Sequence, residues 1–239
     1  AYTSPSSAIP YLRRKARRVL ARAGFDPASH SGKALVNVLD SYPRDDLFQI
    51  EDDELYQFAL AIMQLEERPR VRVLARRERF DRFVSVLAYV PRDRYDSEVR
   101  ERLGAYLAQA FGGRVAEFRP LFLDGPLTRV HFIIERVREE ALSPDRNELE
   151  DAVSAIVRTW DDGFTEALAL VYAPEKADAL RARYAGAFPG GYQASYAPQD
   201  ALSDLRLIER LAAEHPIAAP LHRAEGAARP DTTPVARQG

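Results

Sequence analysis

The fold is decided by residues 70–111, which read RVRVLARRERFDRFVSVLAYVPRDRYDSEVRERLGAYLAQAF. The first seven residues largely alternate between arginine and apolar positions, and this period of two predicts a half-buried strand over 70–76. Residues 82–90 are apolar on both faces and rich in β-branched and aromatic types, which is typical of a central strand that ends at Pro91. A helix is expected over 97–111, with Asp96 or Ser97 as its cap, because one face carries Leu103, Leu107 and Phe111.

The next segment repeats this order of elements. Residues 114–122 and 128–137 predict a second hairpin across Asp124-Gly125-Pro126, and Ser143 before Pro144 predicts the start of another helix. The apolar stripe of that helix is expected to continue through Val157 to Trp160. Two strand pairs, each followed by a helix, predict an α+β fold with a four-stranded antiparallel sheet and helices on one face, in the ferredoxin-like or ACT-like arrangement.

Helical segments flank this predicted sheet on both sides. Helices are expected over 10–23 and 31–41, and a third should be capped by Asp52 or Asp53. Residues 164–214 read as helical, with breaks at Pro174 and at the Pro189-Gly190-Gly191 turn. The sequence therefore predicts an N-terminal helical segment (1–66), an ACT-like domain (67–160), a C-terminal helical segment (161–214) and a disordered tail or linker (215–239).

Composition removes several function classes. The chain of 239 residues has no cysteine, which excludes disulfides, iron–sulfur ligation and cysteine nucleophiles. The formal net charge of -2 disfavours a dedicated nucleic-acid binder, and no apolar run is long enough to span a bilayer. We expect a cytoplasmic protein without nucleic-acid or membrane partners.

Common catalytic and cofactor motifs are missing from the sequence. No glycine pair has the G-x-G spacing of a dinucleotide site, and neither a P-loop nor a G-x-S-x-G nucleophile elbow occurs. The four histidines lack metal-site spacing, and His131 is expected to be a cross-strand or solvent-facing residue. We therefore predict no catalytic residue, no metal site and no cofactor in this chain.

The most distinctive loop joins the central strand to the following helix. An anionic effector is expected to bind there, at a helix N-terminus, through residues drawn from Arg92, Asp93, Arg94, Tyr95 and Ser97. The alternative is that the two arginines pair with Asp93, Asp96 or Glu98 and only fix the turn.

Two arginine-rich segments could serve other partners. RNA binding through the basic cluster Arg76, Arg77, Arg79 and Arg82 is weakly supported, because the strand lacks the RNP1 glycine. The cationic helix over 13–22 is either a solvated face or a docking surface for an acidic partner domain.

Several strings resemble the N-terminal regulatory part of the large bacterial NAD-specific glutamate dehydrogenases. They are RPRVRVL from Arg68, RFVSVLAYVPRDRY from Arg82, AFGG from Ala110, RVHF from Arg129 and TWDD from Thr159, with YPRDDLFQ from Tyr42 and YAGAFP from Tyr184 beside them. The resemblance covers most of residues 10–210.

This resemblance implies an internal piece of a long, oligomeric enzyme in which several ACT-like domains precede the catalytic domain. The parent would use NAD to oxidise L-glutamate to 2-oxoglutarate and ammonia, and its nicotinamide site and active-site lysine would lie outside this sequence. The partners of this piece would be other domains and subunits of the same enzyme, together with an amino-acid effector. The alternative is a stand-alone ferredoxin-like module that binds RNA or a protein partner.

Overall fold

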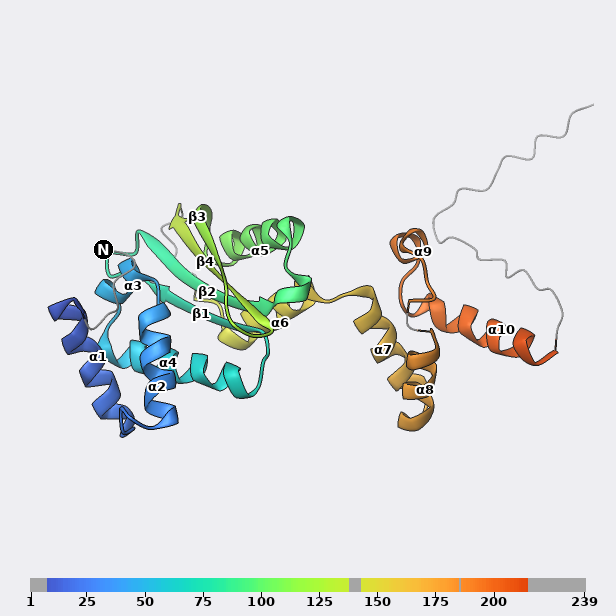
Figure 1. Cartoon of the computed structure of the whole chain (residues 1–239). Coiled ribbons are helices and arrows are strands. Elements are labelled where there is room, and N and C mark those ends of the chain that lie inside the picture. Colours follow the sequence, from blue (N-terminus) through green and yellow to red (C-terminus); the bar gives the residue numbers. More distant parts are fainter. Residues whose placement is uncertain (1–7, 138–142, 185, 215–239) are drawn as a thin grey trace, which may run out of the picture. The chain divides into compact units, whose positions relative to one another are not determined.

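The computed structural model describes residues 8–137, 143–184 and 186–214, so the tail expected over 215–239 lies outside the described residues. The chain divides into two compact units, residues 1–158 and residues 159–239 (Figure 1). The division into four segments made from the sequence stays a prediction.

The first unit is built on one four-stranded antiparallel sheet. Its strands are β1 (Arg72–Arg77), β2 (Phe83–Pro91), β3 (Gly113–Phe122) and β4 (Leu127–Arg136), in the spatial order β1-β2-β4-β3. The predicted α+β class and the central position of β2 are confirmed. Because β2 and β3 both flank β4 and are linked by a helix, they form a split β-α-β unit. The chain order is that of a ferredoxin-like fold circularly permuted to begin at its second strand.

One face of the sheet is covered by α5 (Ser97–Ala110) and α6 (Arg146–Val157). The side chains of Leu103, Leu107 and Phe111 are buried in the same cluster as the β2 and β4 residues Val86, Val130 and Phe132, so the predicted orientation of this helix is confirmed. Gly104 lets α5 approach the sheet closely, since an added Cβ would lie 3.2 Å from the side chain of Val115.

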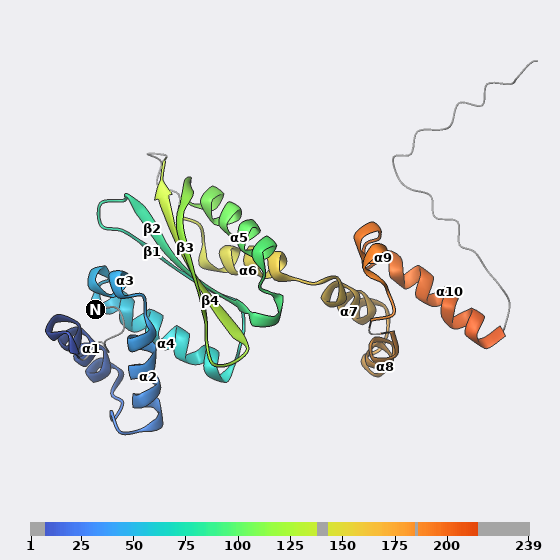
Figure 2. The ribbon, with the colours of Figure 1, turned by 45° about the horizontal axis from the view of Figure 1, so that its top comes forward.

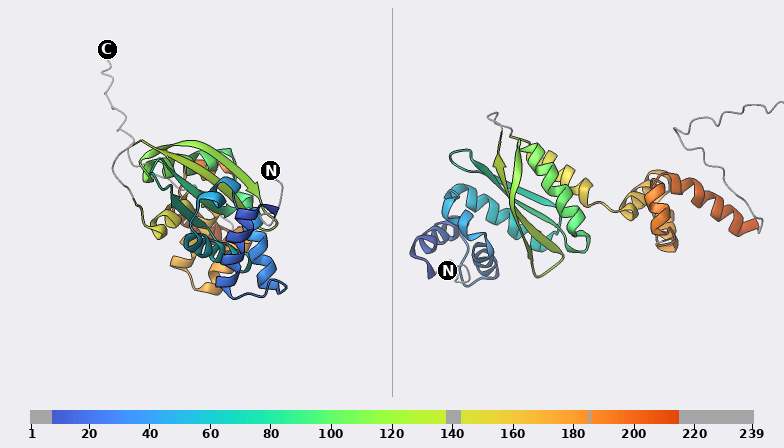
Figure 3. Two further views of the ribbon diagram at one scale, coloured as in Figure 1. Left: turned by 90° about the vertical axis from the view of Figure 1, so that its left-hand side faces the viewer. Right: turned by 90° about the horizontal axis from the view of Figure 1, so that it is seen from above.

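The opposite face is packed against the N-terminal helices α1 (Pro10–Ala23), α2 (His30–Ser41), α3 (Arg44–Gln49) and α4 (Asp52–Glu67). Their apolar side chains share a core with the sheet residues Leu74, Leu87, Tyr89 and Leu127. Figure 2 and the right panel of Figure 3 show the sheet between these blue helices and the green helix α5. The strand β2 is therefore apolar on both faces because helices cover both of them.

The second unit consists of α7 (Trp160–Val171), α8 (Pro174–Tyr184), α9 (Gly190–Ser195) and α10 (Asp200–Glu214). Its core contains a cluster of aromatic side chains. Trp160 stacks on Phe164, with 5.4 Å between the ring centroids, and also packs against Phe188 and Tyr192. The indole N–H of Trp160 donates a hydrogen bond to the carbonyl of Tyr196 at 2.8 Å.

Several predicted helix boundaries are wrong. Asp145, not Ser143, caps α6, and Glu51 occupies the N-cap position of α4 in place of Asp52 or Asp53. Trp160 does not continue the stripe of α6. It begins a new helix in the second unit, where Thr159 and Asp162 form a capping box. The short helix α3 was not foreseen, because six residues are too few to show a helical period.

Candidate functional site

The predicted effector loop forms a short 3₁₀ turn, η2 (Arg92–Arg94), between β2 and α5. Its main chain is tied to the β3–β4 turn, because the Arg92 N–H donates to the Pro126 carbonyl at 2.7 Å. The Arg92 guanidinium lies 5.5 Å from the centre of the Phe122 ring, and Tyr95 meets the same ring edge-on. Strand β3 thus supplies an aromatic support for the loop that the sequence did not reveal.

The Arg92–Ser97 loop is partly exposed and partly buried. Arg92, Asp93 and Ser97 are exposed, which leaves them accessible to a ligand, whereas Arg94 and Tyr95 are half-buried. Asp96 caps α5 and accepts a hydrogen bond from the Val99 N–H at 2.8 Å, so one donor of the first turn is already used. Among the described residues, Arg92 makes no ion pair with the neighbouring carboxylates. Binding of an effector at this loop stays a prediction.

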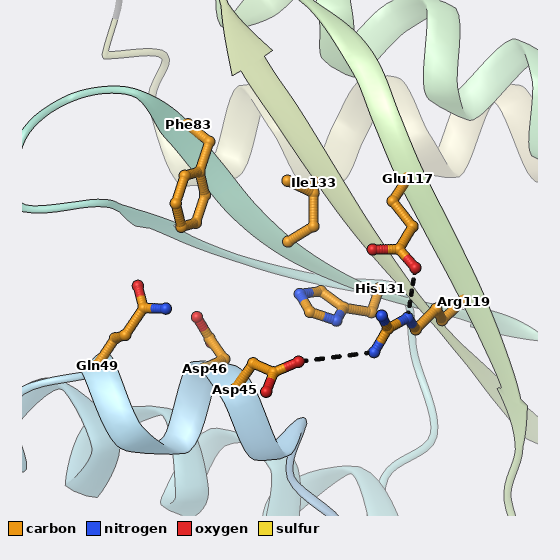
Figure 4. Close-up of a pocket in the computed structure, with 8 residues that line it drawn as sticks. All are labelled: Asp45, Asp46, Gln49, Phe83, Glu117, Arg119, His131 and Ile133. Atoms are coloured by element: carbon orange, nitrogen blue, oxygen red, sulfur yellow. Dashed lines mark hydrogen bonds and ion pairs between the residues drawn. The ribbon is translucent and has the colours of Figure 1, made fainter.

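A second candidate is a small hollow of about 70 Å³ between α3 and the sheet (Figure 4). Asp45, Asp46 and Gln49 reach it from α3, while Glu117, Arg119 and His131 reach it from β3 and β4, and Phe83 and Ile133 form an apolar wall. Arg119 forms two ion pairs, from its Nε to Glu117 Oε1 at 2.7 Å and from a terminal nitrogen to Asp45 Oδ2 at 3.8 Å. The hollow is large enough for a few water molecules.

Beneath this hollow lies a buried ion pair. The Arg76 side chain donates from Nε to Asp46 Oδ1 at 2.8 Å and from a second nitrogen to the same oxygen, with side-chain exposures of 5% and 3%. The pair joins α3 to β1 across 30 residues of sequence. Local sequence gave no sign of it, because Arg76 reads there as one member of a basic cluster.

His131 lies in the wall of this hollow. It is buried, and its Nε2 shares a hydrogen bond of 2.8 Å with the Ser85 hydroxyl, which confirms a cross-strand role. Burial lowers the pKa of His131 to about 4, although the carboxyl group of Asp46 acts in the opposite direction. The ring is therefore neutral at physiological pH.

Ser85, His131 and Asp46 share the residue types of a hydrolytic triad, but their environment is structural. Ser85 is only 1% exposed, so its hydroxyl cannot meet a substrate from solvent, and Asp46 is engaged by Arg76. The Ser85–His131 hydrogen bond gives two buried polar side chains a partner where α3 meets the sheet.

The basic cluster of the first hairpin is largely neutralised. Arg76 pairs with Asp46, Arg77 with Asp81 and Arg82 with Glu78, and the Glu78 carboxylate has a lowered pKa because the Arg82 side chain donates to it. A surface for RNA would need these guanidinium groups to be available to phosphates. This observation weakens the RNA-binding alternative.

Neither a metal-binding cluster nor a membrane-spanning helix occurs within the described residues. No group of three or more histidines and carboxylates in them is placed to hold a metal ion. Within the same ranges, no helix is both long enough and apolar enough to cross a bilayer.

The sheet with α5 and α6 on one face defines an ACT-like α+β domain, and a helical segment lies on each side of it in the sequence. Comparison with known proteins gives the same three segments in the same order. Three glutamate dehydrogenase models match in order: helical motif 1 over residues 9–68, the ACT2 domain over 72–161 and helical motif 2 over 167–211. The chain belongs to the NAD-specific glutamate dehydrogenase family.

Individual relatives support this assignment. The NAD-specific glutamate dehydrogenases of Halomonas elongata and Pseudomonas aeruginosa are 36% and 35% identical to this chain, over 93% and 90% of its length. The enzyme of that name from Mycobacterium tuberculosis is 32% identical over 85% of the chain. The chain spans only 13–14% of the length of these relatives.

Proposed function

We propose that this chain is a non-catalytic regulatory and structural region of an NAD-specific glutamate dehydrogenase. The whole enzyme would convert L-glutamate and NAD to 2-oxoglutarate, ammonia and NADH in the cytoplasm. The observation that carries the proposal is the ordered match of a helical motif, an ACT2 domain and a second helical motif of that family along one chain. The nicotinamide site and the catalytic lysine would belong to other parts of the enzyme.

The first test is catalytic. The purified 239-residue chain should produce no NADH from L-glutamate and NAD, and calorimetry should detect no binding of NAD, because the sequence has no dinucleotide fingerprint. The parent enzyme assayed under the same conditions is the positive control. Turnover by the isolated chain above background would overturn the proposal.

The regulatory part of the proposal concerns an amino-acid effector at the Arg92–Ser97 loop. Two features support this position: exposed Arg92, which can hold a carboxylate, and the adjacent start of α5. Calorimetric titration with L-amino acids should identify the effector, and Arg92→Ala should weaken its binding at least tenfold. Arg102→Ala, which removes an exposed arginine from within α5, is the matched control. Equal binding by both variants would contradict this site.

Contacts with other domains and subunits complete the proposal. Strand β3 is an edge strand that exposes Phe118, Leu121 and Phe122, and edges of this kind are usually covered in an assembly. Cross-linking mass spectrometry on the parent enzyme should place β3 at an interface. If β3 is freely labelled in the intact oligomer, this part of the proposal fails.

A further inference from the structure

A hollow of about 540 Å³ opens beside β1, at the edge of the sheet opposite to β3. It is lined by residues of α4, of the segment that leads into β1 and of the first turns of α6, and all three lie close to β1 in Figure 1. Leu60 and Ala61 give it an apolar part, and its polar side chains include Gln57, Gln64, Arg70, Arg72, Arg146 and Glu150. The volume falls within the range of roughly 300–1,000 Å³ that small-molecule sites occupy.

The floor of the hollow is held by one ion pair. Arg72 donates to Glu150 at 3.0 Å, with side-chain exposures of 7% and 15%, and Glu150 also accepts from the Val73 N–H at 3.3 Å. These bonds join β1 to α6 and leave the floor without net charge. The Nε of Arg72 is buried and has no hydrogen-bond partner among the described residues.

The rim of the hollow carries a positive charge that the described residues do not balance. Arg70 and Arg146 are exposed, and neither side chain forms an ion pair or hydrogen bond within the described part of the chain. An adjoining hollow of about 360 Å³ shares Gln64 and Arg70 with the first and adds Arg68 and Glu67. The two hollows together therefore have more arginines than carboxylates.

The chemistry of this lining selects an anion. Guanidinium groups form paired hydrogen bonds with carboxylate and phosphate oxygens, and the side-chain amides of Gln57 and Gln64 add neutral donors. A free amino acid fits less well, because Glu150 is already occupied by Arg72 and no other carboxylate in this hollow remains for an ammonium group. The first turn of α6 contributes little, since Asp145 already accepts from the Asn147 and Glu148 N–H groups.

We propose that this hollow binds a small multivalent anion, either a dicarboxylate or a phosphate compound, between Arg70 and Arg146 with Arg72 beneath it. This site is distinct from the Arg92–Ser97 loop and does not depend on the function proposed above. Because its residues come from α4, β1 and α6, a bound anion would connect the N-terminal helices to the far face of the sheet.

The test is isothermal titration of the 239-residue chain with succinate, inorganic phosphate and acetate at a constant 150 mM NaCl. This salt concentration screens diffuse attraction between exposed charges. We expect one site per chain for succinate or for phosphate, with acetate at least tenfold weaker. The better of the two divalent probes distinguishes a dicarboxylate site from a phosphate site.

Paired variants separate this site from general attraction to positive charge. The double variant Arg70→Gln with Arg146→Gln should weaken anion binding at least tenfold. The control Arg13→Gln with Arg17→Gln removes the same charge from the exposed face of α1 and should leave the affinity for the anion unchanged. Circular dichroism should show that both double variants remain folded. The proposal is overturned if neither divalent anion binds, or if the two double variants bind equally.

Discussion

Replacing Asp46 with alanine should destabilise the first unit more than any exposed charge change in the same helices. Asp46 lies on α3 and accepts two hydrogen bonds from Arg76 on β1. Their side chains are only 3% and 5% exposed, so the truncation leaves a guanidinium group buried without its counter-charge. An arginine side chain does not lose its proton at accessible pH, so this guanidinium group stays charged.

The expected loss follows from the burial of this pair. Breaking a buried ion pair by removing one partner costs about 3–5 kcal/mol of unfolding free energy. The matched control is Asp52→Ala on α4, because the Arg18–Asp52 pair joins neighbouring helices at the surface, with side-chain exposures of 50% and 34%. Exposed pairs contribute about 0–1 kcal/mol, so the control should remain close to the native stability.

The assay is urea unfolding followed by far-ultraviolet circular dichroism. Hydrogen exchange of the β2 and β4 peptides locates the change in the first unit, which is needed because the only tryptophan, Trp160, lies in the second. The double variant Asp46→Leu with Arg76→Met should recover most of the loss, since it leaves no buried charge. A loss of less than about 1 kcal/mol for Asp46→Ala would refute the assignment of this pair as a buried structural link.

Three other predictions can be checked with the same measurements. His131 stays neutral in the folded chain down to about pH 4, whereas its unfolded pKa is near 6.5. Protonation therefore favours unfolding, and stability should fall by about 2 kcal/mol between pH 8 and pH 5, a loss that His131→Gln should reduce. Leu107→Ala should lower the free energy of unfolding by about 2–5 kcal/mol, because Leu107 is fully buried against the sheet. An unchanged urea midpoint would contradict this packing. Gly113→Ala should cost more than about 2 kcal/mol, because the added Cβ would lie 2.1 Å from the Glu135 carbonyl oxygen; native stability would show that β3 can shift to accommodate it.

Local sequence patterns were sufficient to predict the elements of the sheet and the order in which they occur. The alternation of 70–76, the apolar run of 82–90 and the stripe of Leu103, Leu107 and Phe111 are local patterns, and each reappears as the expected strand or helix. These patterns are readable because a side chain's position along a strand or helix fixes the direction in which it points. The family resemblance rested partly on strings from these segments and partly on strings elsewhere in the chain.

The cover of the second face of the sheet, and the polar groups that meet there, depend on how distant segments pack together. The sequence showed that β2 is apolar on both faces, but it did not show that α1–α4 cover the second of these faces. Arg76 and Asp46 are 30 residues apart, and the Arg129 side chain reaches the Ser41 carbonyl across 88 residues. Local periodicity records whether a residue faces a core and carries no information about its distant partner. The buried ion pair, the neutral His131 and the arginine-lined hollow beside β1 therefore depend on how the helices pack on the sheet.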